Sequence, residues 1–151
     1  FLTDTKGSGI MNTLFDSYLP WFGAIPQRNT GVLIADRPGK VTAYASHAMT
    51  DRGELFVSVN TEVYKGMIIG ERNRPGDLDV NIIREKKLTN VRSSTSDATV
   101  VLRPPRNLSL DQCIEFISED ELLEVTPASV RLRKRELDIN KRISLNKKNN
   151  Q

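Results

Sequence analysis

The chain alternates short apolar runs with turn residues, a pattern that indicates several strands and few helices. Runs typical of strands occupy residues 32–35, 41–44, 55–59, 67–69, 80–83 and 100–102. The first two runs flank Arg37-Pro38-Gly39-Lys40, where proline presets φ and glycine accepts the positive φ of a type II turn. We therefore predict a hairpin-like pair at this position.

Two segments have helical patterns. Residues 43–49 are rich in alanine and precede Gly53, a possible left-handed cap, so a short helix is predicted there. The clearest helix begins at Ser109, which forms a capping box with Gln112. The apolar positions that follow are spaced along one helical face and are expected to be buried: Leu110, Cys113, Ile114 and Ile117.

The two ends of the chain are less regular. Residues 9–18 fit either an amphipathic helix or an irregular strand, and residues 19–29 contain Pro20, Gly23 and Pro26, as expected of a linker at a domain boundary. Residues 137–151 are rich in Lys and Asn, which indicates either a mobile arm or a segment with some order. The order of elements predicts an α+β fold, a mixed and mostly antiparallel sheet with one or two short helices.

Composition narrows the class of protein. With 151 residues, 38% of them hydrophobic, the chain can bury a core without metals. One cysteine, Cys113, and one histidine, His47, exclude an internal disulfide and a four-ligand zinc site, so a reducing compartment is expected. No apolar run approaches the roughly 20 residues of a membrane helix, so we expect no membrane association. Because position 1 is Phe, we expect a piece of a longer protein.

The charge is unevenly distributed. The formal net charge is only +3, yet residues 1–80 carry 8 basic and 9 acidic side chains (8 − 9 = −1), and residues 81–151 carry 14 and 10 (14 − 10 = +4). Residues 107–126 contain six acids and no base. Segregation of this kind either creates local fields that attract phosphates or marks ordinary solvated faces.

No catalytic constellation is present in the sequence. Lys6-Gly7-Ser8-Gly9 lacks the spacing of a phosphate-binding loop, which indicates a flexible or bulged segment. His47 has no recognisable nucleophile partner, and Cys113 on an apolar stripe is interpreted as a buried small hydrophobic residue. We therefore expect no enzyme activity, metal or cofactor in this chain.

Two basic features are candidate RNA contacts. Val130 and Leu132 alternate with Arg131, Arg133 and Arg135, so a half-buried strand would place three guanidinium groups on one exposed face. The alternative is a solvated edge strand whose charges prevent aggregation.

The other candidate is the loop around residues 86–96, where basic residues lead into a stretch of small polar ones. Such a loop packs poorly against its own domain and can fold against a partner, although it can equally be a mobile surface loop. Its candidate RNA-binding residues are Lys86, Lys87, Asn90 and Arg92.

Four strings, in the right order and at the right spacing, resemble the C-terminal part of the TypA/BipA translational GTPases. They are FLTDTKGSGIMN at residues 1–12, VYKGMIIGE at 63–71, KKLTNVRSS at 86–94 and DELLEVTPASVRLRKR at 120–135. The resemblance covers nearly all of residues 1–136. It implies that residues 1–27 end a domain like the last one of elongation factor G and include the linker, that 28–136 form the family-specific C-terminal domain, and that 137–151 are a basic polar tail.

The resemblance also implies a function. A family C-terminal domain contacts large-subunit ribosomal RNA and the acceptor arm of the A-site tRNA near the peptidyl-transferase region, and residues 86–96 match its exposed loop. GTP and Mg²⁺ would belong to a missing N-terminal domain, since the GTPase motifs are absent here. The implied parent acts as a monomer in the cytoplasm or a plastid stroma, in large-subunit assembly and growth under stress or cold. The alternative function is protein docking through the acidic helix at residues 109–124.

Overall fold

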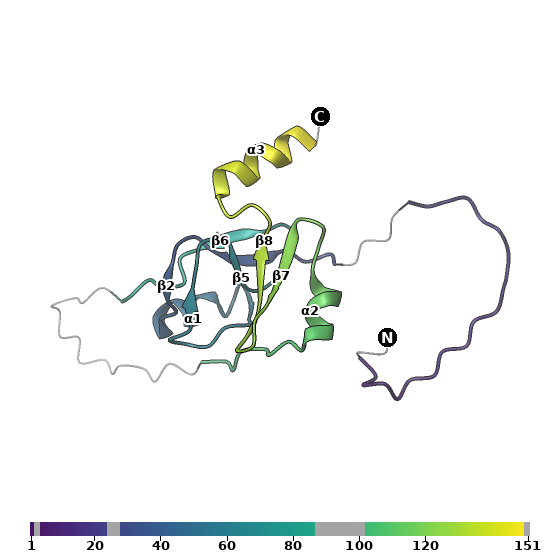
Figure 1. The fold of residues 1–151 in the computed structure, drawn as a ribbon, viewed down its shortest axis with the longest axis horizontal. Coiled ribbons are helices and arrows are strands. Elements are labelled where there is room, and N and C mark those ends of the chain that lie inside the picture. Colours follow the sequence, from purple (N-terminus) through teal and green to yellow (C-terminus); the bar gives the residue numbers. More distant parts are fainter. Residues whose placement is uncertain (2–3, 24–27, 87–101, 150–151) are drawn as a thin grey trace.

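A computed structural model describes residues 1, 4–23, 28–86 and 102–149. The main body is a six-stranded sheet with short helices packed against it, while residues 4–23 extend away from it as a long irregular stretch (Figure 1). The α+β fold class predicted from the sequence is therefore confirmed.

The main sheet is mixed and mostly antiparallel. Its strand order is β6 (Leu78–Val80), β1 (Val32–Ala35), β5 (Met67–Arg72), β8 (Val130–Lys134) and β7 (Glu121–Val125), and β3 (Gly53–Leu55) also pairs with β5. Only β1 and β6 run parallel among these pairs. A separate two-stranded sheet contains β2 (Gly39–Lys40) and β4 (Glu62–Val63). The sequence pattern did not predict β4 as a strand.

The apolar residues of the central strands alternate between two small cores. In β1, Leu33 and Ala35 face the core cluster that includes α1, whereas Val32 and Ile34 face the cluster that includes Cys113. All four β1 residues have no exposed surface. A strand buried on both faces accounts for the unbroken apolar run at this position in the sequence.

The predicted hairpin at Arg37-Pro38-Gly39-Lys40 is wrong. β1 pairs with β5 and β6, whereas Lys40 and Gly39 of β2 pair with Glu62 and Val63 of β4. Both hydrogen-bonding edges of β1 are therefore occupied by strands other than β2. The second expected strand at residues 41–44 instead leads into a helix that begins at Ala43.

Both expected helices form. α1 spans Ala43–Met49 and begins at Thr42, whose hydroxyl accepts a hydrogen bond from the Ala45 amide at 3.2 Å. Gly53 does not cap it, since Gly53 begins β3 instead. α2 spans Leu110–Phe116 and has the predicted capping box of Ser109 and Gln112.

The basic strand β8 lies inside the sheet. It pairs with β5 on one side and β7 on the other, so the alternative of a solvated edge strand is wrong. Leu132 is buried as predicted, but Val130 is 39% exposed at the strand's start.

The ends of the chain differ from expectation. Residues 8–23 form neither the helix nor the strand considered for 9–18, and their large apolar side chains are exposed. The tail at residues 137–151, for which a mobile arm was considered, contains a helix, α3 (Ile139–Asn149). This helix is attached to the domain by Arg142, which pairs with Asp79 of β6, and by Asp138, whose Oδ2 lies 2.6 Å from Lys65 Nζ. The strand expected at residues 100–102 falls mostly outside the described residues, and Leu102 is not in a strand.

Candidate nucleic-acid interface

The segment with most of the candidate RNA contacts begins next to α1. Lys87, Asn90 and Arg92 lie outside the described residues, and Lys86 before them is exposed. The structure therefore describes only the surface around Lys86, where this segment begins.

An open groove of about 680 Å³ lies on this surface. Four apolar residues line it, Val41, Ala43, Val59 and Ile83. The polar and aromatic residues that line it are Lys40, Thr42, Tyr44, Asn60, Glu85 and Lys86. Two ammonium groups and one carboxylate leave the lining positive, which suits phosphate oxygens.

Hydrogen bonds hold the two walls of the groove together. Thr42 donates its hydroxyl to the Arg84 carbonyl at 2.6 Å and its amide to the Ile82 carbonyl at 3.2 Å. The Asn60 amide donates to the Val41 carbonyl at 2.9 Å, and Asn60 adopts a left-handed φ of 67°. Backbone contacts of this kind preform the groove.

The three arginines of the β8 region do not share one exposed face, so that geometric prediction is wrong. β8 ends at Lys134, and the exposed Arg135 beyond it donates a hydrogen bond to the Glu119 carbonyl at 3.0 Å. Arg133 is half-buried, and its Nε lies 2.7 Å from Glu124 Oε1. Arg131 is half-buried. Because Arg133 already has a carboxylate partner, it is less available to a phosphate than Arg135.

Glu124 connects this pair to the core. The Tyr64 hydroxyl donates to Glu124 Oε2 at 2.6 Å. Burial, followed by the hydrogen bond to Glu124, raises the pKa of Tyr64 well above its usual range. The phenol therefore stays protonated and acts as a donor that fixes the Glu124 carboxylate.

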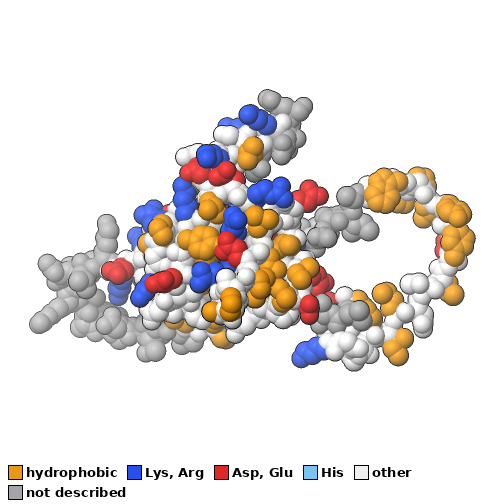
Figure 2. Space-filling view, viewed as in Figure 1, with side chains coloured by type: hydrophobic (Ala, Val, Ile, Leu, Met, Phe, Trp, Pro, Cys, Tyr) orange, Lys and Arg blue, Asp and Glu red, His pale blue; other side chains and the backbone are white. Residues whose placement is uncertain are grey.

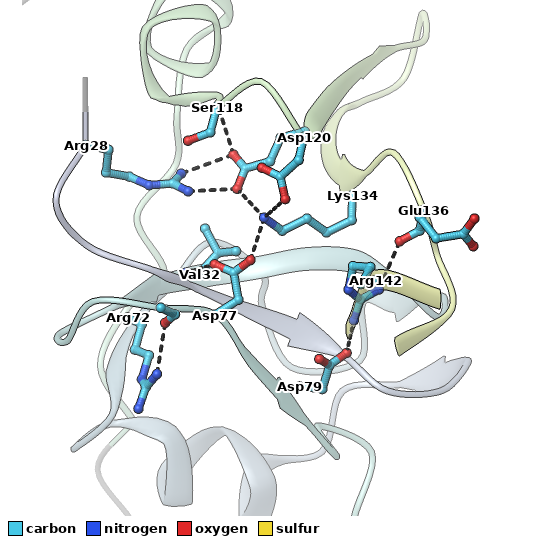
Figure 3. Close-up of polar contacts among 12 residues, drawn as sticks. Arg28, Val32, Arg72, Asp77, Asp79, Ser118, Asp120, Lys134, Glu136 and Arg142 are labelled. Carbon is cyan, nitrogen blue, oxygen red and sulfur yellow. Dashed lines mark hydrogen bonds and ion pairs between the residues drawn. The ribbon is translucent and has the colours of Figure 1, made fainter. Parts of the chain in front are cut away.

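Lys134 is the charged residue that the sequence analysis missed. Its side chain is 2% exposed, and Nζ lies 2.6 Å from Asp77 Oδ2, 2.8 Å from Asp120 Oδ2 and 2.9 Å from Glu121 Oε1 (Figure 3). Burial alone would lower the pKa of Lys134, but hydrogen bonds to Asp120 and Asp77 and the charge of Glu121 outweigh it, and the pKa is raised. The ammonium group stays charged and links β8 to β7 and to the turn before β6.

Arg28 completes this network from the other side. Its two terminal nitrogens contact the buried Glu121 carboxylate at 2.7 and 3.1 Å (Figure 3). The guanidinium also lies 4.3 Å from the centre of the Phe116 ring and donates to the Phe116 carbonyl. These contacts anchor the start of the domain to the end of α2.

The apolar stripe of α2 is only partly buried. Cys113 is 4% exposed and Ile117 packs against the core, but Leu110 and Ile114 are 45% and 56% exposed. The predictions that Leu110 and Ile114 are buried are therefore wrong. A seven-residue helix covers one end of the sheet with Cys113 and Phe116, and its remaining apolar face lies on the surface, within the hydrophobic patch near α2 and β7 in Figure 2.

Chemical sites of other kinds are not favoured. Within the described ranges, no group of three or more His, Cys, Asp and Glu side chains is arranged to hold a metal ion. Burial raises the pKa of the Cys113 thiol, which disfavours the nucleophilic thiolate. His47 is exposed on α1. No described helix is both long and apolar enough to cross a membrane.

The matching family model is the TypA/BipA C-terminal domain, over residues 30–139. That range contains the sheet, α1, α2 and the groove. The chain belongs to the TypA/BipA family. The recognition from the four sequence strings is therefore confirmed.

Relatives from bacteria and a plastid are similar over most of the chain. The large ribosomal subunit assembly factor BipA of Bacillus subtilis is 48% identical over 98% of this chain, and that of Salmonella typhimurium is 47% identical over 97%. A putative chloroplastic TypA-like elongation factor of Arabidopsis thaliana is 50% identical over 87%. The chain spans 24% of each of the two bacterial TypA/BipA proteins and 19% of the plant one.

Proposed function

We propose that this chain is the RNA-binding C-terminal part of a large-ribosomal-subunit assembly factor. The observation that carries the proposal is the basic groove at the base of residues 87–101, in a domain whose bacterial relatives are named for large-subunit assembly. Lys40 and Lys86 line that groove, and the sequence that follows Lys86 adds Lys87 and Arg92. Basic side chains at this density favour phosphate contacts, which position an RNA without reading its sequence.

The finer contacts are part of the same proposal. Lys86, Lys87, Asn90 and Arg92 bind large-subunit ribosomal RNA and the acceptor arm of the A-site tRNA near the peptidyl-transferase region. Arg131 and Arg135 add phosphate contacts at a second place. We assign Arg133 to the fold, because Glu124 already neutralises it.

The proposal for the whole protein is a GTPase of which this chain is a non-catalytic part. Residues 1–27 end the domain that resembles one of elongation factor G, residues 28–136 bind RNA and residues 137–151 are an accessory basic segment. GTP and Mg²⁺ bind outside this chain, since the turn at Lys6 and Gly7 lacks the spacing of a phosphate-binding loop. The parent acts as a monomer, in the cytoplasm or a plastid stroma, in subunit assembly and in growth under stress or cold.

Co-sedimentation with large ribosomal subunits tests this proposal. The double variant Lys87→Ala/Arg92→Ala removes two proposed phosphate contacts and should weaken binding several-fold without changing the melting temperature. The matched control is Lys147→Ala/Lys148→Ala, which removes the same charge from the exposed side of α3. Equal binding by the wild type and both double variants at physiological salt would contradict a role for the loop.

A second candidate function is supported by the exposed apolar face of α2. Leu110 and Ile114 lie beside the acids of residues 107–126, a combination suited to a basic, partly apolar protein segment. Binding through this face would depend on Ile114 and only weakly on salt. The salt dependence of ribosome binding therefore separates the two functions.

A further inference from the structure

Tyr44 is an aromatic residue that the fold holds at the surface. It is 41% exposed and belongs to neither of the two core clusters among the described residues. Its helix neighbours Ala45 and Met49 are buried and anchor α1 to the sheet. The position of Tyr44 is therefore fixed by the helix, while its own ring is left available at the wall of the groove.

The surroundings of the Tyr44 ring are basic. The Arg84 guanidinium lies 5.9 Å from the centre of the ring. The backbone carbonyl of Arg84 accepts a hydrogen bond from the Thr42 hydroxyl at the start of α1. Lys40 and Lys86 line the same groove, and the carboxylate among its lining residues is that of Glu85. A flat aromatic surface next to cations is the combination with which proteins bind unpaired bases.

We propose that Tyr44 and Arg84 form a stacking platform for one unpaired RNA base, whose flanking phosphates contact Lys40 and Lys86. This inference rests on the proposed RNA-binding function and specifies its ligand as a single-stranded nucleotide. Bases within a duplex are already stacked and cannot lie against the ring. The volume of about 680 Å³ is within the range of about 300–1,000 Å³ found for small-ligand sites.

Asn60 adds a polar group at the same site. Its backbone is fixed by the hydrogen bond to Val41 and by the left-handed turn, and the exposed side chain lines the groove. A carboxamide has one acceptor and two donors, and it pairs with two atoms on the edge of adenine. Asn60 can therefore pair with the edge of a base that stacks on Tyr44, and adenine is a suitable probe.

Binding of the full chain to a labelled ten-nucleotide oligoadenylate tests the platform. Tyr44→Ala should weaken binding about 5- to 150-fold, as expected for the loss of one stacked base, whereas Tyr44→Phe should stay within about threefold of the wild type. His47→Ala is the matched control, because His47 is exposed on the same helix but does not line the groove. A duplex of the same length should bind wild type and Tyr44→Ala equally.

A fluorescence measurement tests the same platform even if Tyr44→Ala alters folding. Trp21 is the single tryptophan, so Trp21→Phe/Tyr44→Trp places one reporter in the groove. Oligoadenylate should quench its emission, whereas duplex RNA at equal phosphate concentration should not. Equal affinity of wild type and Tyr44→Ala, without quenching of the reporter, would overturn the platform and leave the proposed function standing. Failure of the wild type to bind any RNA or the ribosome would overturn both.

Discussion

At the scale of single residues, the charges of this domain have two different uses. Lys134 is almost fully buried and contacts three carboxylates, whereas Lys40 and Lys86 line an open groove. Removal of a buried ion-pair partner leaves an uncompensated charge in a low-dielectric region, while loss of a surface charge leaves stability nearly unchanged. Stability and RNA binding should therefore respond to different lysines.

The buried network around Lys134 should stabilise the fold. Lys134→Met should lower the free energy of unfolding by about 1.5–3 kcal/mol, because the buried Glu121 carboxylate loses one charged hydrogen-bond partner and keeps Arg28. Urea denaturation measures the change, and Lys148→Met on the exposed side of α3 is the control. An unchanged midpoint for Lys134→Met would mean that this network does not stabilise the fold.

At the scale of elements, α2 and β8 differ in how much of each is buried. Ile114→Ala should change the free energy of unfolding by less than about 0.5 kcal/mol, because Ile114 is 56% exposed. Leu132→Ala should cost about 2–5 kcal/mol, since Leu132 is 4% exposed in the core. Thermal or urea unfolding compares the two variants directly. A loss of 2 kcal/mol or more for Ile114→Ala would show that α2 packs more closely than the structure indicates.

The attachment of α3 should depend on pH. The hydrogen bond from Lys65 and those from the Lys141 and Asn140 amides lower the pKa of Asp138 to about 2. Because this is below the usual value of about 3.9, the contribution of Asp138 is present above about pH 4 and is lost as the pH falls through about 2.

An NMR titration of the Asp138 carboxyl tests this. The Asn140 and Lys141 amide signals should shift with the same midpoint as the carboxyl. Asp138→Asn keeps the capping oxygen but removes the charge, so the shift of the Asn140 and Lys141 amide signals with this midpoint should be lost. A carboxyl that titrates near 3.9 would contradict the pairing with Lys65.

Local patterns predicted part of the fold and long-range contacts decided the rest. The capping box of Ser109 and the alternation around Leu132 involve residues close in sequence, and both correctly located an element. The hairpin prediction failed because β1 pairs with β5 and β6, which lie much further along the chain than the local turn. Lys134 follows Leu132 by two positions in β8. The alternation that placed Leu132 on the buried face of the strand therefore also places Lys134 there.

The candidate site was harder to predict. Tyr44 lies on a helix that the sequence did predict. The Tyr44 ring contacts Arg84, forty positions later in the chain, because the hydrogen bond from Thr42 holds the Arg84 backbone beside α1. No local pattern contains that contact. The exposure of Ile114 likewise depends on the short length of α2 and on how far it covers the sheet.

At the scale of the whole molecule, charges and apolar surfaces are separated. The groove at the base of residues 87–101 carries basic residues, whereas the α2 face carries exposed apolar residues and acids. The two surfaces favour different partners, RNA phosphates for the first and protein for the second.

The salt dependence of binding to large ribosomal subunits tests the central claim most directly. If the groove binds RNA, the logarithm of the affinity should fall linearly with the logarithm of the salt concentration, and Lys40→Ala should reduce the slope by about 0.7–0.9. Ile114→Asp should leave both affinity and slope unchanged. A salt-independent affinity that Lys40→Ala leaves intact and Ile114→Asp abolishes would contradict the account and identify the α2 face as the binding surface.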